Sequence, residues 1–305
     1  MGLADLTNKL KAQRQHRAGQ RLFQFSREAR ATKERLPLQP GQTFRASSLP
    51  YLCPREEVLA HKYDVTRVEF VHPRMEITWS IGKIFHDMYR DSYYGPMQEW
   101  AGAWECLRCG WDTDKAGISA SPVFKKKVVS RGKLATMPGT CGGCGAPFML
   151  PPERNEERCY GTFKEWLLVD KVIGLHGHPD GWSKRYGIER VLVDLKSHGN
   201  NGFTSRNTLR SGHDLQVWSY QHMSGDELGE VWYMNKSPWG DPLAFVREVV
   251  TPFDVNNFKL FVADPLYQVH NGIAGGPMPE RVCVNAECAR ARECQLNDVC
   301  FDDGV

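Results

Sequence analysis

The chain has 305 residues, 41% of them hydrophobic and 25% charged, with a formal net charge of +3. This is the composition of an ordinary soluble protein with one large domain or two smaller ones. The sequence excludes a membrane or secreted protein, because no apolar run approaches the roughly 18 residues of a membrane helix and residues 1–15 lack the apolar segment of a signal peptide. We therefore expect a cytoplasmic protein with no membrane partner.

A basic N-terminal arm, residues 1–45, is the first predicted element. Its cations outnumber its acids and are spaced mostly three or four residues apart, so they would line one side of a helix that could track a phosphate backbone. A solvated helical arm that frays is the alternative. The cations are Lys9, Lys11, Arg14, Arg17, Arg21, Arg27, Arg30, Lys33 and Arg35.

An amphipathic helix is predicted over residues 78–94, with Ser80 as its N-cap. His86 lies beside the apolar stripe of this helix, where a histidine is more often a packed core residue than a ligand. The apolar residues that recur at helical spacing, and would pack the helix on a core, are Ile81, Ile84, Phe85 and Met88.

The strongest local signal is a pair of C-x2-C-G turns that contain Cys106, Cys109, Cys141 and Cys144. Cytosolic thiols stay reduced, so this spacing favours metal ligation over disulfides. Each turn lets two thiolates converge on one ion while the following glycine relaxes the backbone, which predicts a four-cysteine zinc ribbon. A basic stretch between the turns suits nucleic acid, although a solubilising surface explains it nearly as well. Its cations include Lys125, Lys126, Lys127, Arg131 and Lys133.

Residues 166–182 are predicted to form one strand, and residues 189–197 its antiparallel partner, with a turn at 184–187 between them. On strand periodicity His176, His178 and Asp180 share one face. These three side chains are a candidate metal site by themselves, and their imidazoles would favour zinc or another transition metal.

A second arrangement uses the ends of the two strands. Asp180 and Asp194, meeting at adjacent strand ends, can hold a hard divalent cation through oxygen, and the ammonium of Lys196 can stabilise charge on a phosphate or orient the attacking water. A helix predicted from about residue 208 carries Gln216 and Tyr220 at i and i+4, where an amide and a phenol could both meet a nucleic-acid strand. Phosphodiester hydrolysis requires parts of this kind.

The remaining cysteines suggest a second metal centre near the C-terminus. The C-x5-C-x5-C run of Cys288, Cys294 and Cys300, together with the distant Cys53, can supply the four thiolates of a [4Fe-4S] cluster. Cys283 is an alternative ligand in place of one of these, and a second zinc site is a competing interpretation. Such a cluster would close a long loop and clip the two ends of the domain together. Cys159 lacks such neighbours in the sequence, and a buried thiol is its default interpretation.

The chain resembles the RecB-like branch of the PD-(D/E)XK nucleases over residues 46–300. With Cys53 and the C-terminal cysteines added, it is similar to the iron-sulfur exonucleases associated with CRISPR systems. The family's C-terminal run is usually C-x2-C-x5-C, so the wider spacing here leaves the cluster ligands open. The motifs that carry the resemblance are G-x3-H (Gly82 to His86), G-x2-D (Gly177 to Asp180), D-x-K (Asp194 to Lys196) and Q-x3-Y (Gln216 to Tyr220).

The resemblance implies an α/β fold, in which a PD-(D/E)XK core of mixed sheet flanked by helices carries an inserted zinc ribbon and a C-terminal Fe-S lobe. It implies that His86, Asp180 and Asp194 bind Mg²⁺ or Mn²⁺ with the backbone carbonyl of Leu195. Lys196 would then activate water or stabilise the developing charge, and Gln216 and Tyr220 would position the strand and support Lys196. The implied reaction is metal-dependent hydrolysis of DNA from ends or in single strands.

These expectations divide the chain into five segments. After the basic arm come the N-terminal part of the nuclease (46–103), the ribbon insertion (104–148), the nuclease core (149–272) and the Fe-S segment (273–305). The ribbon could grip DNA, dock a helicase or recombination partner, or support the sheet, and DNA contact is preferred. The alternatives for the whole protein are a DNA-end-binding adaptor that does not cut and a site-specific endonuclease.

Overall fold

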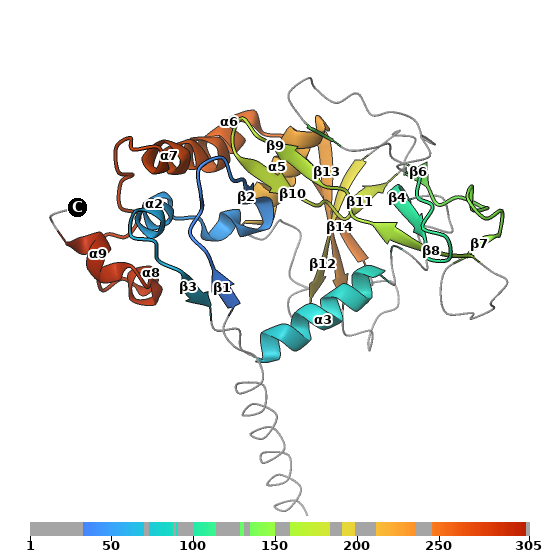
Figure 1. The fold of residues 1–305 in the computed structure, drawn as a ribbon, viewed down its shortest axis with the longest axis horizontal. Helices are drawn as coiled ribbons and strands as arrows, with labels where there is room; N and C mark the ends of the chain where they lie inside the picture. The colour runs from blue at the N-terminus through green and yellow to red at the C-terminus, as the bar shows by residue number, and fades with distance from the viewer. Residues whose placement is uncertain are drawn as a thin grey trace, which may run out of the picture.

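The computed structural model describes residues 33–69, 73–87, 90, 100–113, 129–130, 135–149, 159–183, 191–198, 212–235 and 246–302. The fold is mixed α/β, as expected, and Figure 1 shows strands in its middle and at one end, with most helices at the other end. Within the described ranges, no helix has the length and apolar character needed to cross a membrane. The predicted cations of the arm before residue 33, and those between residues 125 and 133, lie outside the described residues.

The largest sheet is mixed and contains eight strands. Along its path lie β14 (Val246–Pro252), β13 (Leu228–Asn235), β12 (Val191–His198), β11 (Gly181–Ser183), β4 (Trp100–Cys106), β8 (Cys159–Lys164) and β7 (Phe148–Met149), and β6 (Ala135–Thr136) pairs with β4. The second sheet contains β2 (Phe44–Arg45), β10 (Leu175–Gly177), β9 (Leu168–Asp170) and β5 (Val129–Ser130), and the third pairs β1 (Lys33–Arg35) with β3 (Arg67–Glu69). The burial of the Cys159 side chain is not described, so the expectation of a buried thiol at this position stays a prediction.

The helices lie mainly on one side of these sheets and at one end of them (Figure 1). They are η1 (Ala46–Tyr51), α2 (Pro54–Lys62), α3 (Pro73–Asp87), α5 (His213–Ser224), α6 (Val255–Phe258), η4 (Lys259–Ala263), α7 (Asp264–Ile273), α8 (Ala289–Glu293) and α9 (Asn297–Phe301). Figure 1 shows α2, α7, α8 and α9 gathered at one end of the molecule, and β4, β6, β7 and β8 at the other.

Strands β12 and β13 run parallel at the centre of the large sheet, joined through α5. Both are rich in large apolar residues that are buried on both faces, as parallel pairs usually are. One face carries Leu192 and packs with Val217 and Met223 of α5. Asp194 and Lys196 lie on that same face, because side chains alternate along a strand. The sequence of β12 therefore directs its two charged residues toward α5.

The prediction of one continuous strand over residues 166–182 is wrong. It divides into β9, a turn at 171–174 and β10, and only then reaches β11, which pairs antiparallel with β12 as expected. The carboxylate of Asp170 produces the turn by accepting hydrogen bonds from the N–H groups of Val172 (2.7 Å) and Ile173 (3.3 Å), and Gly174 follows with φ of 69°. The predicted turn 184–187 lies outside the described residues.

Helix α3 also differs from its prediction. It begins at Pro73, a residue favoured in the first turn of a helix, so Ser80 is an exposed mid-helix residue and not the N-cap. Ile81 and Ile84 are 39% and 64% exposed, whereas Phe85 packs against the core beneath the large sheet. Contrary to expectation, the helix therefore does not turn the side with Ile81 and Ile84 toward β12. Met88 lies outside the described residues.

Candidate functional site

Six residues singled out in the sequence lie together where β11, β12, α3 and α5 meet. His86 ends α3, Asp180 precedes β11, and the others come from β12 and α5. All are buried except His86 and Lys196, whose side chains are 23% and 22% exposed. The six are His86, Asp180, Asp194, Lys196, Gln216 and Tyr220.

Asp180 connects α3 to the large sheet. Its Oδ1 lies 3.3 Å from Nδ1 of His86, and its Oδ2 accepts a 2.7 Å hydrogen bond from the backbone N–H of Leu195. Burial alone would raise the pKa of Asp180, but the neighbouring His86 and Lys196 and the Leu195 hydrogen bond outweigh burial and lower it to about 2. Asp180 is therefore a stable carboxylate. The predicted contact of the Leu195 carbonyl with a metal stays a prediction.

Asp194 is the most deeply buried acid of the group, at 1% exposure. Its Oδ1 accepts a 3.2 Å hydrogen bond from the Gln216 amide, and its Oδ2 lies 2.7 Å from Nζ of Lys196. Burial and the charge of Asp180 raise the pKa of Asp194 to about 6, despite Lys196. Oδ2 has no hydrogen-bond partner, so its contact with Lys196 is an ion pair without hydrogen-bond geometry.

Gln216 links the charged residues to Tyr220. Its Oε1 accepts from Nζ of Lys196 at 3.0 Å, and its Nε2 donates to the Tyr220 hydroxyl at 2.8 Å. Gly177 lies against the other side of this phenol, because a Cβ there would come 2.4 Å from the Tyr220 ring. The glycine of the G-x2-D motif therefore makes room for the tyrosine of the Q-x3-Y motif.

The donor set fits a hard divalent cation. Carboxylates are ligands that Mg²⁺ and Mn²⁺ prefer, whereas the imidazole is more usual on a transition metal, and Asp194 Oδ2 is a buried oxygen with no hydrogen bond to lose. Within the described chain, however, the only group whose ligand atoms all lie within 4.8 Å of one another is a set of cysteines. Binding an ion would therefore require the ligand atoms of His86, Asp180 and Asp194 to come closer together than they are here.

The alternative metal site at His176, His178 and Asp180 does not form a compact ligand group among the described residues. Nδ1 of His176 lies 2.9 Å from Oγ1 of Thr43, and both carboxylate oxygens of Asp180 face other partners. The two histidines lie beside the six residues, and their role as metal ligands stays a prediction.

The four-cysteine group predicted from the two C-x2-C-G turns is present. Cys106, Cys109, Cys141 and Cys144 place their sulfur atoms within 4.8 Å of one another, so they can hold a metal ion. The glycine after each turn has a positive φ, 68° at Gly110 and 70° at Gly145, and donates to the carbonyl of the first cysteine. Burial would raise the pKa of Cys141, but the N–H groups of the following turn lower it to about 6.

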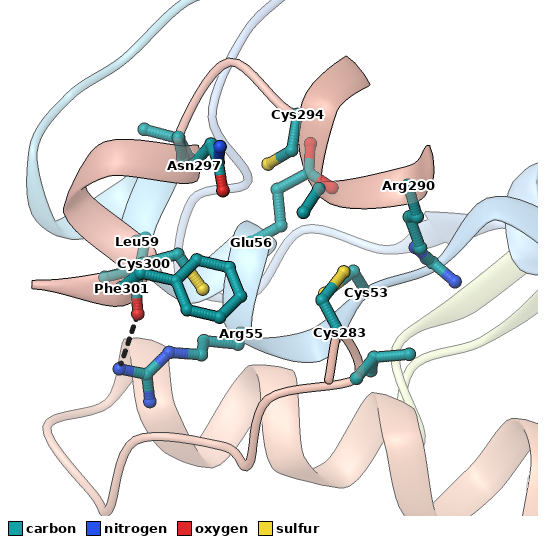
Figure 2. Close-up of a pocket in the computed structure, with 13 residues that line it drawn as sticks. Cys53, Arg55, Glu56, Leu59, Cys283, Arg290, Cys294, Asn297, Cys300 and Phe301 are labelled. Carbon is teal, nitrogen blue, oxygen red and sulfur yellow. Dashed lines mark hydrogen bonds between the residues drawn. The ribbon is translucent and has the colours of Figure 1, made fainter. Parts of the chain in front are cut away.

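A pocket at the opposite end of the molecule collects the other cysteines (Figure 2). Cys53, Cys283, Cys294 and Cys300 line it, together with Glu56, Asn297 and Arg290, which the sequence did not indicate. Cys288, which was predicted as a ligand, is not on the lining. Its sulfur caps the N-terminus of α8 by accepting from the N–H of Ala291 at 3.4 Å. The side chains of Cys283 and Cys288 nevertheless share a hydrogen bond, so the choice between these two thiols as a cluster ligand stays a prediction.

No family model matches the sequence, and no curated protein matches it. Two solved structures are similar to it in part. The crystal structure of SSO0001 has 13% identity and a TM-score of 0.35, and the match covers 87% of this chain and 88% of that one. The alkaline exonuclease LHK-Exo from Laribacter hongkongensis has 8% identity and a TM-score of 0.34, and the match covers 78% of this chain and 92% of that one. Likenesses this distant carry no argument about fold or activity.

Proposed function

We propose that the protein is a Mg²⁺- or Mn²⁺-dependent DNA nuclease with a PD-(D/E)XK core of the RecB-like type, which acts on ends or single strands. The observation that supports this best is that two buried carboxylates, those of Asp180 and Asp194, lie together with Lys196 and Gln216 and have pKa values shifted in opposite directions. Buried acids repel each other unless a cation neutralises them, and the charge of Asp180 is one cause of the raised pKa of Asp194.

In this proposal His86, Asp180 and Asp194 hold the divalent ion, which would supply positive charge to the scissile phosphate and lower the pKa of a bound water. Lys196 stabilises charge instead of accepting a proton. Burial would lower the pKa of its ammonium, but Asp194 and Asp180 outweigh burial and raise it, so the amine stays charged. Gln216 fixes the direction of that ammonium, since it binds both Lys196 and Asp194.

The test is digestion of labelled single-stranded and duplex DNA, with and without Mn²⁺. Asp194→Asn should abolish cleavage, and Lys196→Ala should slow it by about 10²–10³-fold, the usual effect of removing one group that stabilises transition-state charge. Lys259→Met, at an exposed lysine of η4, is the control and should cleave as the parent does. Parental rates for Lys196→Ala would contradict the mechanism.

The same assay separates the alternatives. Loss of label from DNA ends supports the exonuclease, discrete internal fragments support a site-specific endonuclease, and tight binding without any cleavage supports an adaptor.

We further propose that the four-cysteine turns hold Zn²⁺ and that the C-terminal pocket holds a [4Fe-4S] cluster. Thiolate sets of these two kinds are usual for the two metals. The basic residues between the turns are proposed to contact DNA, and the ribbon is an alternative docking site for a helicase or recombination partner.

A further inference from the structure

A polar face on β2 and β10 lies next to the candidate site. The two strands pair in parallel, with His176 opposite Arg45. Phe44, Leu175 and Gly177 are buried in the core, so the alternate residues of both strands point the other way. That other face carries Thr43, Arg45, His176 and His178, of which Arg45 is exposed and the rest are half-buried.

This polar face adjoins the chain segment that leads to Asp180. His178 precedes Asp180 by two residues, and the same strand packs through Gly177 on the ring of Tyr220 and on Ala46 of η1. Arg45 is near enough to Tyr220 for its charge to oppose the rise of the phenol's pKa that burial causes. The face is therefore held at a fixed position relative to α5 and the candidate metal ligands.

The groups on this face have hydrogen-bonding capacity to spare. Nδ1 of His176 lies 2.9 Å from Oγ1 of Thr43, which leaves the Nε2 side of the ring for another partner. Nδ1 of His178 is buried without a hydrogen-bond partner. Arg45 forms no ion pair with any residue in the described ranges. Desolvation, the charge of His178 and that of Arg45 lower the pKa of His176, so this ring is a neutral donor and Arg45 supplies the positive charge.

We propose that Arg45, His176 and His178 form a binding subsite for the backbone phosphate next to the scissile one in a single DNA strand. A guanidinium binds a phosphate through two parallel hydrogen bonds, and imidazole N–H groups can add further ones. Alternate residues of a strand are about 6.6 Å apart, a distance that one nucleotide step can span. The subsite rests on the proposed nuclease function and assigns a path to its substrate.

The test measures DNA binding without cleavage, in an Asp194→Asn background. Binding of a labelled single-stranded oligonucleotide is followed by fluorescence anisotropy over a range of salt concentrations. Arg45→Met should raise Kd about tenfold, as expected for the loss of a hydrogen-bonded charge, and should lower the slope of log Kd against log salt by about 0.7. His178→Gln should raise Kd, because it removes an imidazole from the subsite.

Two matched substitutions serve as controls. Arg292→Met removes an exposed arginine of α8, and His61→Gln removes another histidine whose Nδ1 is buried without a partner. Both should bind as the background does. Arg45→Lys keeps the charge but not the paired hydrogen bonds, so it should retain the slope and lose part of the affinity; it also carries the test if Arg45→Met does not fold.

The outcomes keep the two proposals apart. If the parent cleaves DNA but Arg45→Met and His178→Gln bind with parental affinity and slope, the subsite is wrong and the nuclease stands. If the parent never cleaves but Arg45→Met lowers affinity and slope, the three residues bind a DNA phosphate that is not next to a scissile one, and the nuclease is wrong. If neither cleavage nor binding is found, both are wrong.

Discussion

A single hydrogen-bonded chain of side chains sets the position of the charged residues in the site. It runs from Asp194 and Lys196 through Gln216 to Tyr220, and it ends where the tyrosine ring meets Gly177. Every member of this chain depends on the next for its direction, because buried polar groups are costly unless they are paired. A change at its far end should therefore reach the carboxylates.

Gly177→Ala tests this dependence. The new Cβ would lie 2.4 Å from the Tyr220 ring and 3.1 Å from Cβ of Ala46, so the ring must move and its hydrogen bond to Gln216 must weaken. We expect a loss of about 1–3 kcal/mol in the free energy of unfolding, measured by urea denaturation, and slower cleavage. Gly139→Ala, where the added methyl meets no atom within 4 Å, is the matched control. A Gly177→Ala protein with parental stability and activity would show that the contact does not matter.

At the level of elements, the β9–β10 turn holds the polar face of β10 in register. Asp170 closes this turn and also lies 3.0 Å from Nε2 of His222, whose ring stacks on Phe258. Burial would raise the pKa of Asp170, but the bonds from His222, Val172 and Ile173 outweigh burial and lower it. The turn is therefore stabilised by the ionised form of this acid.

The stabilisation by Asp170 should depend on pH in a defined direction. A carboxylate whose pKa is lowered by folding stabilises the protein above its unfolded pKa of about 3.9 and loses that contribution as pH falls. We expect Asp170→Asn to lose about 1–3 kcal/mol of unfolding free energy near pH 7, the cost of leaving buried partners unpaired, and the difference from the parent to shrink below about pH 5. Urea denaturation of both proteins across this range measures it. A difference that grows as pH falls would contradict the assignment.

Across the whole molecule, the C-terminal lobe is attached to segments more than two hundred residues earlier. The side chain of Gln295 accepts a hydrogen bond from the N–H of Val68 in β3 (3.0 Å) and donates to its carbonyl (2.5 Å), and Leu296 packs with Leu59 and Ala60 of α2. Arg67 of β3 forms buried ion pairs with Glu57 of α2. A metal centre in the cysteine pocket would strengthen an attachment that side chains already make.

Adjacent thiols allow a sharp test of the proposed cluster. Cys283→Ser should lower the iron and sulfide content of anaerobically purified protein and its Tm, because Cys283 lines the pocket, while Cys288→Ser should change them little. Zinc content should stay constant in both, since the four-cysteine turns are separate. Loss of iron from Cys288→Ser alone would show that Cys288, and not Cys283, is the cluster ligand. Absence of iron from the parent would contradict the cluster proposal.

How far the sequence could predict this arrangement depends on the distance between partners. Asp194 with Lys196, and Gln216 with Tyr220, were paired correctly because the repeat of a strand or a helix sets which neighbours share a face. The pairing of Arg45 with His176 could not be read this way, because periodicity says nothing of which strand lies beside which. The same limit explains why spacing alone could not decide between Cys283 and Cys288, whose side chains share a hydrogen bond.

The origin of the six clustered side chains has a consequence for protein synthesis. They come from positions between His86 and Tyr220, on elements that meet only when β11 and β12 pair and α5 closes over them. A nascent chain that has not yet emerged from the ribosome beyond α5 lacks Gln216 and Tyr220, and its Asp194 has no amide beside it. Under the proposed function, we therefore expect a polypeptide truncated before residue 212 not to cleave DNA, because it lacks Gln216 and Tyr220.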